Sequence, residues 1–112
     1  MKKAIVLILL FAGLYVKDVS AQDQTIKIKT SAVCGECKTT IEKALNFSKG
    51  VKKASLDVDS KMVTVVFRAE KTDPDKIKLA ISKAGYDADS IPANPKAYAR
   101  LKDCCKKGGH PE

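Results

Sequence analysis

The spacing of apolar residues along the chain alternates between the period of a strand and that of a helix. Residues 25–30 alternate polar and apolar side chains, which predicts a half-buried strand with Ile26 and Ile28 facing inward. Between residues 37 and 47 the apolar positions recur at i, i+3 and i+4, which predicts an amphipathic helix that stops at Gly50.

The second half of the pattern predicts a hairpin, another helix and a last strand. Residues 51–58 and 62–67 alternate and are separated by a short polar turn, as in an antiparallel hairpin. Residues 73–84 carry an aspartate cap, a proline in the first turn and a helical apolar stripe. Residues 86–91 would form a short last strand. The order βαββαβ predicts an α+β, ferredoxin-like sandwich with an antiparallel sheet and two helices on one face.

A C-terminal helical extension is expected after this sandwich. Pro92 and Pro95 mark a boundary, and Asn94 can cap a third helix that Pro95 opens and Gly108 ends. The positions that share one stripe on this helix are Ala97, Leu101, Cys104 and Cys105.

The N-terminus has the pattern of a secretory signal peptide. Two lysines precede an apolar run over residues 4–16, which is shorter than the roughly 20 residues that span a bilayer. Small residues at 19–21 form a cleavage site, so we expect cutting after Ala21 and a periplasmic or secreted protein without stable membrane insertion. The predicted organisation is a signal peptide at 1–21, one domain at 22–91 and a C-terminal helix and tail at 92–112.

The net charge is +8, and the chain stays basic without its first 21 residues. The lysines are scattered and aromatic residues are few, which argues against nucleic acid as a partner. A solubilising surface is the favoured interpretation of this charge. The alternative is a basic face that steers docking onto an acidic partner protein.

Four cysteines form two local pairs, Cys34/Cys37 and Cys104/Cys105. Export would expose them to an oxidising compartment, where paired cysteines usually form disulfides. A disulfide framework, however, normally ties distant segments together. Local pairs suit metal binding or redox chemistry better.

The C-x-x-C segment at residues 34–37 supports two kinds of chemistry. Two converging thiolates select soft ions such as Cu(I). Because Cys37 lies at the start of the predicted helix, free N–H groups there stabilise its thiolate, which favours both metal binding and disulfide exchange. The alternative function is therefore a thioredoxin-like thiol–disulfide oxidoreductase with Cys34 as the attacking thiol. The order of elements argues against it, because the cysteines follow the first strand and no proline opens a later strand beside them.

Residues 25 to about 90 resemble the heavy-metal-associated (HMA) domain family, which includes copper chaperones, metal-ATPase N-terminal domains and the periplasmic mercuric-ion binding protein. The family loop reads Gly-Met-x-Cys-x-x-Cys, and residues 31–37 here read Ser-Ala-Val-Cys-Gly-Glu-Cys. Residues 84–86 also match the family's Ala-Gly-Tyr segment. The resemblance implies that Cys34 and Cys37 bind a metal through their sulfurs, near-linearly, and pass it on by ligand exchange.

The same resemblance implies that Tyr86 lies near the metal loop. Two positions depart from the family pattern, since Ser31 and Ala32 stand in place of its glycine and methionine. That methionine packs under the loop in the family, so Ala32 is expected to leave the loop looser or to let another side chain fill the space.

The sequence thus predicts a soft-metal-binding protein that carries or sequesters metal and is not an enzyme. Cu(I) is the first choice of ion, and Hg(II), Ag(I) and Zn(II) are the other candidates. The expected partner is a metal-transporting membrane protein or a periplasmic metal carrier, and the expected state is a monomer or a weak metal-bridged dimer.

Additional ligands are expected from the C-terminal tail. Cys104, Cys105 and His110 are the candidates, because the glycines before His110 would let it fold back. Successive helical residues point about 100° apart, so the two cysteines can serve one site only if the helix end unwinds. A second soft-metal site formed by the tail alone is the other interpretation.

Overall fold

The computed structural model describes residues 23–107 of the chain. The predicted signal peptide at 1–21 and the candidate ligand His110 lie outside the described residues. Within 23–107, no helix is both long enough and apolar enough to cross a membrane.

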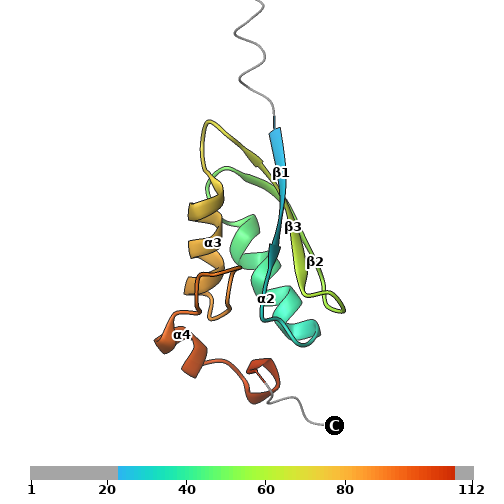
Figure 1. Cartoon of the computed structure of the whole chain (residues 1–112), viewed down its shortest axis with the longest axis vertical. Helices are drawn as coiled ribbons and strands as arrows, with labels where there is room; N and C mark the ends of the chain where they lie inside the picture. The colour runs from blue at the N-terminus through green and yellow to red at the C-terminus, as the bar shows by residue number, and fades with distance from the viewer. Residues whose placement is uncertain (1–22, 108–112) are drawn as a thin grey trace, which may run out of the picture.

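A three-stranded antiparallel sheet forms one layer of the fold (Figure 1). Its strands are β1 (Asp23–Lys29), β2 (Val51–Asp57) and β3 (Met62–Arg68), in the order β1-β3-β2. Ile28 pairs with Val63 across the β1/β3 ladder, and both are fully buried, so alternation turns the apolar residues of each strand to the same face. The predicted hairpin is present as β2 and β3.

Two helices, α2 (Gly35–Asn46) and α3 (Pro74–Lys83), cover one face of this sheet (Figure 1). The helix α3 begins as predicted, because the Asp73 side chain accepts a hydrogen bond of 2.9 Å from the Lys76 N–H. The α+β ferredoxin-like fold is therefore confirmed. The largest aliphatic and aromatic side chains of the core between helices and sheet are Ile28, Ile41, Leu45, Val63, Val65, Phe67, Ile77 and Ile81.

The strand predicted at residues 86–91 is reduced to isolated bridges. Ala88 forms one such antiparallel bridge with Thr30, just beyond the end of β1. The next residue, Asp89, has a φ of +52°, which turns the chain away from an extended path. Asp89 still ties this turn to β1, since its N–H donates to the Lys29 carbonyl and its carboxylate accepts from the Lys29 N–H.

The C-terminal extension contains two short elements in place of one long helix. The helix α4 (Pro95–Ala99) begins as predicted, with the Asn94 side chain accepting from the Ala97 N–H at 3.0 Å. The backbone then leaves the helix and forms a 3-10 turn, η1 (Asp103–Cys105). We call residues 100–107 the tail. The prediction of a single third helix is wrong.

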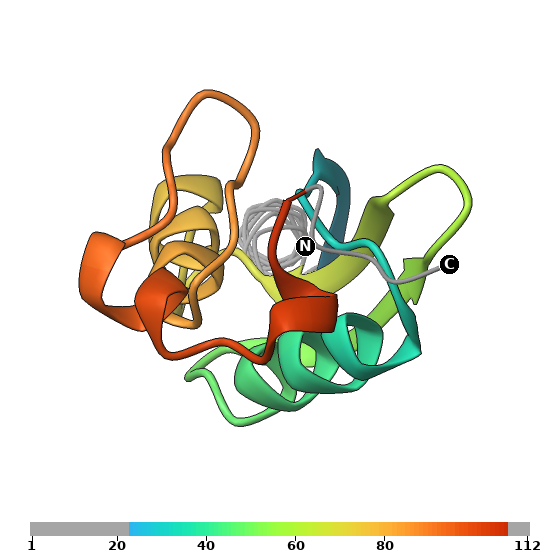
Figure 2. The same cartoon turned by 90° about the horizontal axis from the view of Figure 1, so that it is seen from below.

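The apolar stripe that suggested one helix has a different physical cause. Leu101 packs against the core beside Gly85, whereas Cys105 is buried at the segment that precedes α2. Both side chains line one pocket beside Tyr86, so the stripe reflects their burial against the same end of the domain and does not require a continuous helix. Seen from the loop end of the molecule, the tail runs from α4 across to the start of α2 (Figure 2).

Gly85 lets α4 and Leu101 pack closely onto the domain, and its replacement tests that contact. Gly85 has a φ of +106°, and an added Cβ would lie 3.2 Å from backbone atoms of Ala97. We expect Gly85→Ala to lower the free energy of unfolding by about 1–2 kcal/mol or more, measured by urea denaturation.

Gly35→Ala is the matched control for Gly85→Ala. An added Cβ at Gly35 meets no heavy atom within 4 Å, and the residue opens α2. Its replacement is expected to leave stability unchanged or to raise it by up to about 1 kcal/mol through helix propensity. Equal urea midpoints for the two variants would contradict the proposed close contact at Gly85.

Candidate metal centre

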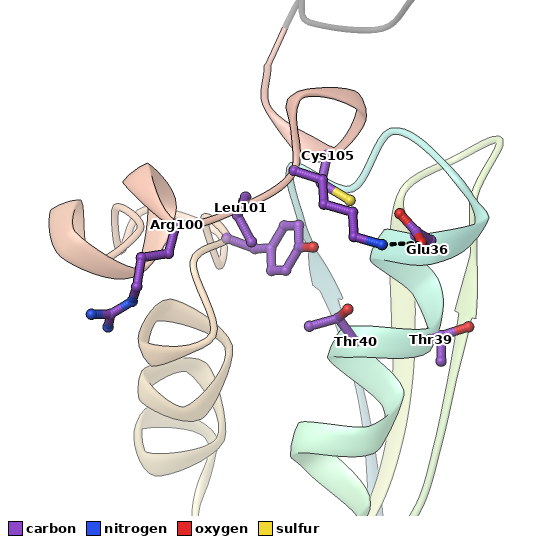
Figure 3. A pocket seen from close by; sticks show the side chains of 8 residues that line it. Glu36, Thr39, Thr40, Arg100, Leu101 and Cys105 are labelled. Atoms are coloured by element: carbon purple, nitrogen blue, oxygen red, sulfur yellow. Dashed lines mark hydrogen bonds and ion pairs between the residues drawn. The ribbon is translucent and has the colours of Figure 1, made fainter.

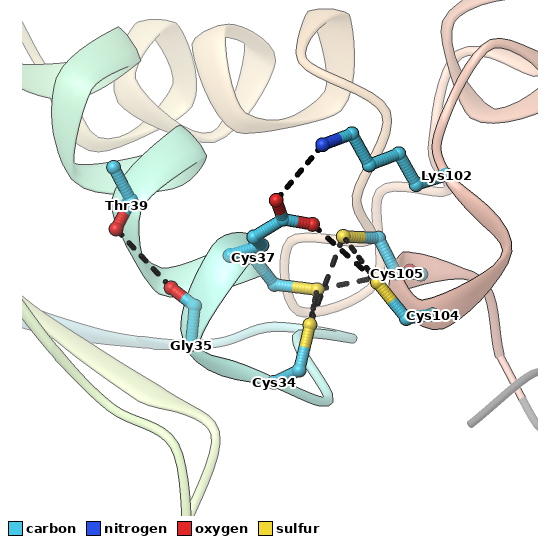
Figure 4. A network of polar contacts seen from close by, with 8 residues as sticks. Cys34, Gly35, Cys37, Thr39, Lys102, Cys104 and Cys105 are labelled. Carbon is cyan, nitrogen blue, oxygen red and sulfur yellow. Dashed lines mark hydrogen bonds and ion pairs between the residues drawn. The ribbon is translucent and has the colours of Figure 1, made fainter. Parts of the chain in front are cut away.

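The C-x-x-C loop connects the end of β1 to the start of α2. Cys34 is the N-cap residue of α2, with an extended backbone, and its carbonyl accepts the first helical hydrogen bond from Lys38. Cys37 lies in the first turn and is fully buried, while Cys34 is half-exposed. Their Sγ atoms are 3.3 Å apart (Figure 4). The helix start thus brings both predicted ligands to one point.

Polar bonds anchor the loop backbone beneath these cysteines. Ala32 is fully buried, and its N–H donates to Thr30 Oγ1 at 3.2 Å. The Thr30 hydroxyl in turn donates to the Lys61 carbonyl at 2.9 Å. Ser31 Oγ accepts a 2.9 Å bond from the Asp87 N–H. Ala32, through Thr30, therefore ties the loop to the turn between β2 and β3, and Ser31 ties it to the segment after α3.

The tail brings the second cysteine pair to the same end of the molecule (Figure 4). Cys105 is buried, with its Sγ 3.7 Å from that of Cys34 and 4.0 Å from that of Cys104. The Cys37 thiol donates to the Cys105 carbonyl at 3.8 Å. The sulfurs of Cys34, Cys104 and Cys105 all lie within 4.8 Å of one another. The break after α4 removes the helical constraint that would have separated the two adjacent cysteines.

Ion pairs fix the tail over the loop. Lys102 Nζ lies 2.9 Å from Glu36 Oε2, and the Cys104 thiol donates to Glu36 Oε1 at 3.4 Å. Lys107 Nζ lies 2.6 Å from Asp87 Oδ2. Glu36 is exposed, yet it contacts the tail through both Lys102 and Cys104. No local sequence pattern indicates a partner 66 positions away.

The thiols of Cys34, Cys104 and Cys105 differ in their tendency to ionise. Burial of the Cys34 thiol opposes ionisation, but hydrogen bonds from the Cys37 N–H and from neighbouring thiols outweigh it and lower the pKa of Cys34 to about 7. Burial and the adjacent loop sulfurs raise the pKa of Cys105. The Glu36 carboxylate, followed by desolvation, raises the pKa of Cys104. Of these three thiols, Cys34 is therefore the first to offer a thiolate in the metal-free site.

This difference predicts a pH profile for chemical modification. The pKa of Cys34 in the folded protein is lowered from 9.0 to about 7, so its thiolate is present above that pH and is lost as the pH falls through it. We expect the rate at which iodoacetamide alkylates Cys34 to rise with pH, with a midpoint near pH 7. Peptide mass spectrometry after reaction in metal-free reducing buffer measures this rate.

Cys104 is the internal control for that profile. It is also partly exposed, but its raised pKa should move its modification to higher pH than that of a free thiol. A Cys34 profile that coincides with that of Cys104 would contradict the role assigned to the hydrogen bonds at the loop.

Tyr86 lies beneath the sulfur cluster, as the resemblance implied. Its side chain is 1% exposed, and its hydroxyl has no hydrogen-bond partner among the residues that the structure describes. Burial, followed by the nearby sulfurs of Cys37 and Cys105, raises the pKa of Tyr86. An open pocket of about 370 Å³ borders this position, and Figure 3 shows it between α2 and the tail, with Glu36 and Thr40 on one side and Leu101 on the other.

Known proteins match the body of the domain. The sequence profile described as the heavy-metal-associated domain matches residues 25–87. A copper-exporting P-type ATPase of Staphylococcus aureus (strain JH9) is 40% identical over 73 residues, which are 65% of this chain and 9% of the ATPase. The chain thus spans about a tenth of the length of that relative.

Two solved structures show the same arrangement of helices and strands. The CopZ metallochaperone superposes with a TM-score of 0.56 at 30% identity, over 58% of this chain and 98% of its own. Oxidized MerP from Ralstonia metallidurans CH34 superposes with a TM-score of 0.59 at 28% identity, over 61% of this chain and 96% of its own. The profile match ends at residue 87, before α4 and the tail.

Proposed function

This chain belongs to the heavy-metal-associated domain family, and from that premise we propose that Cys34 and Cys37 bind one soft metal ion, Cu(I) first, and hand it to a partner by thiolate exchange. The observation that carries the proposal is the 3.3 Å approach of the two Sγ atoms at the start of α2. At that place the helix N-terminus stabilises thiolates, and two thiolates favour a soft ion over a hard one.

The two cysteines have different parts in the exchange. Cys34 is half-exposed and has the lowered pKa, so its thiolate meets the incoming ion first. Cys37 is buried behind it and binds second. On transfer, a thiolate of the partner bonds to the ion while the Cys34–metal bond breaks, and Cys37 follows in the same way. The metal keeps its oxidation state, and no covalent bond to carbon forms or breaks.

The names of the similar proteins support a choice of partner. One is a copper-exporting ATPase and another is a metallochaperone, so the proposed partner is a metal-transporting membrane protein or a second metal carrier. The N-terminal pattern supports export, and the proposed location is the periplasm or the exterior. Hg(II), Ag(I) and Zn(II) are the alternative ions.

Anaerobic Cu(I) titration against a competing chelator tests the proposal. The reduced protein should retain one equivalent of Cu(I) and transfer it to the isolated metal-binding domain of a copper-exporting ATPase. It should not reduce insulin disulfides. Insulin reduction without retained copper would overturn the proposal in favour of a thiol–disulfide oxidoreductase acting through Cys34.

A further inference from the structure

The tail cysteines lie outside the part of the chain that matches the family profile, yet they meet the loop pair. Cys105 Sγ is 3.7 Å from Cys34 Sγ, and Cys104 Sγ is 4.0 Å from Cys105 Sγ. The remaining separation in this trio, between Cys34 and Cys104, is within 4.8 Å. Cys37 adds a fourth sulfur, 3.3 Å from Cys34. The three sulfurs of Cys34, Cys104 and Cys105 therefore surround one volume, and Cys37 adjoins this trio through Cys34.

The sulfur separations indicate a coordination number. With metal–sulfur bonds of about 2.3 Å, sulfurs are about 4.6 Å apart in a linear site, about 4.0 Å apart in a trigonal site and about 3.8 Å apart in a tetrahedral site. The separations of 3.7 Å and 4.0 Å match the trigonal and tetrahedral values. The 3.3 Å separation of the loop pair is shorter than any of them. The separations that involve the tail sulfurs are therefore the ones that suit a site of three or four sulfurs.

We propose that Cys104 and Cys105 close over the ion held by the loop, so that the intact protein binds it through three or four thiolates. This inference rests on the proposed function, because Cys34 and Cys37 must themselves be ligands. The additional sulfurs give the site a capacity for Zn(II), which takes four ligands in a tetrahedron. His110 has no part in the proposal.

The surroundings of the tail supply what such a site needs. The Lys102–Glu36 and Lys107–Asp87 ion pairs hold the tail on both sides of the cysteines. Of the two lysines, Lys102 is also close enough to interact with the charges of Cys104 and Cys105. Cys105 is buried and Cys104 is partly exposed, so the tail has an outer sulfur that an incoming ligand can reach.

A closed site has a consequence for metal transfer. A partner's cysteines would have to displace the tail sulfurs before they reach the ion, and Cys104 is the exposed point of entry. The tail would therefore slow release of the ion and raise the selectivity for ions that accept more than two thiolates. A variant without the tail cysteines should transfer Cu(I) faster than the wild type.

Zn(II) binding by the full chain, under anaerobic reducing conditions, tests the shared site. X-ray absorption spectroscopy should find three or four sulfurs around Zn(II) in the wild type and two sulfurs in the Cys104→Ser, Cys105→Ser variant. Chelator competition should give a dissociation constant at least tenfold higher for that variant. Asp103→Ser is the matched control, since it changes the same turn without removing a sulfur, and it should behave as the wild type.

The possible failures are distinguishable. An unchanged sulfur count and affinity in the tail variant would overturn the inference while leaving the loop site intact. Full Zn(II) affinity in a Cys34→Ser, Cys37→Ser variant would also overturn it, because the tail would then bind alone. Absence of both Cu(I) and Zn(II) binding in the wild type would mean that the proposed function itself has failed.

Discussion

The Cys34→Ser, Cys37→Ser variant is expected to bind Cu(I) more weakly than the wild type by a factor of about 10³ or more. Loss of a residue that only supports a ligand typically costs about 10–100-fold in affinity. Here two soft ligands in direct contact with the ion are replaced by hard hydroxyl groups, which bind a soft ion poorly. Anaerobic chelator competition measures the change.

The tail variant Cys104→Ser, Cys105→Ser is the matched control for this experiment. It carries the same number of serine substitutions at the same end of the molecule, but it keeps the loop pair. It should lose far less Cu(I) affinity than the loop variant. Circular dichroism should show that both variants keep the native helical content. Equal losses of affinity in the two double variants would contradict the assignment of the loop pair as the primary ligands.

The Tyr86→Ala variant is expected to lose about 3–5 kcal/mol of folding free energy, as buried aromatic residues do when truncated to alanine. Tyr86 is among the largest fully buried side chains and lies where the core meets the sulfur cluster. The cavity left behind would remove support from both the loop and the tail. Urea denaturation monitored by circular dichroism measures the loss.

The Tyr86→Phe variant separates the ring from its hydroxyl. That hydroxyl is buried without a hydrogen-bond partner, and leaving such a group unpaired costs about 1–3 kcal/mol. Its removal should leave the free energy of unfolding unchanged or raise it in the metal-free protein. A Phe variant clearly less stable than the wild type would show that the hydroxyl is in fact bonded, and this result is informative even if Tyr86→Ala does not fold.

The spacing of apolar residues correctly predicted the helices and strands that pack one face against the core, because such packing makes apolar residues recur at a regular interval. The alternation in β3 and the i, i+3, i+4 spacing in α3 are of this kind, and both elements appear where expected. The pattern misassigned residues 86–91 and 100–105, where local features decide the path. Asp89 takes a left-handed conformation, and no apolar period encodes that turn. The stripe through Leu101 and Cys105 came from packing of both side chains against the core beside Tyr86, which the non-helical tail also achieves.

The site was predictable to the extent that its members are close in sequence. The C-x-x-C spacing and its position before a helix indicated Cys34 and Cys37 without reference to a structure. The approach of Cys105 was not predictable in the same way, because it depends on where α4 ends and on the ion pair of Lys102 with Glu36. A salt bridge between residues 66 positions apart leaves no periodic signal in the chain.

The distance along the chain between the two cysteine pairs links metal binding to protein lifetime. Cys34 and Cys105 are 71 positions apart, so an ion bound to both would close a loop that contains every helix and strand of the domain except β1. A cross-link of that span restricts the unfolded chain and is worth about 4 kcal/mol in the loop-entropy description. Small domains have only about 5–15 kcal/mol of total stability. Metal supply would then set how often the chain opens to proteases, so that the protein persists while it carries its ion and is cleared more quickly when empty.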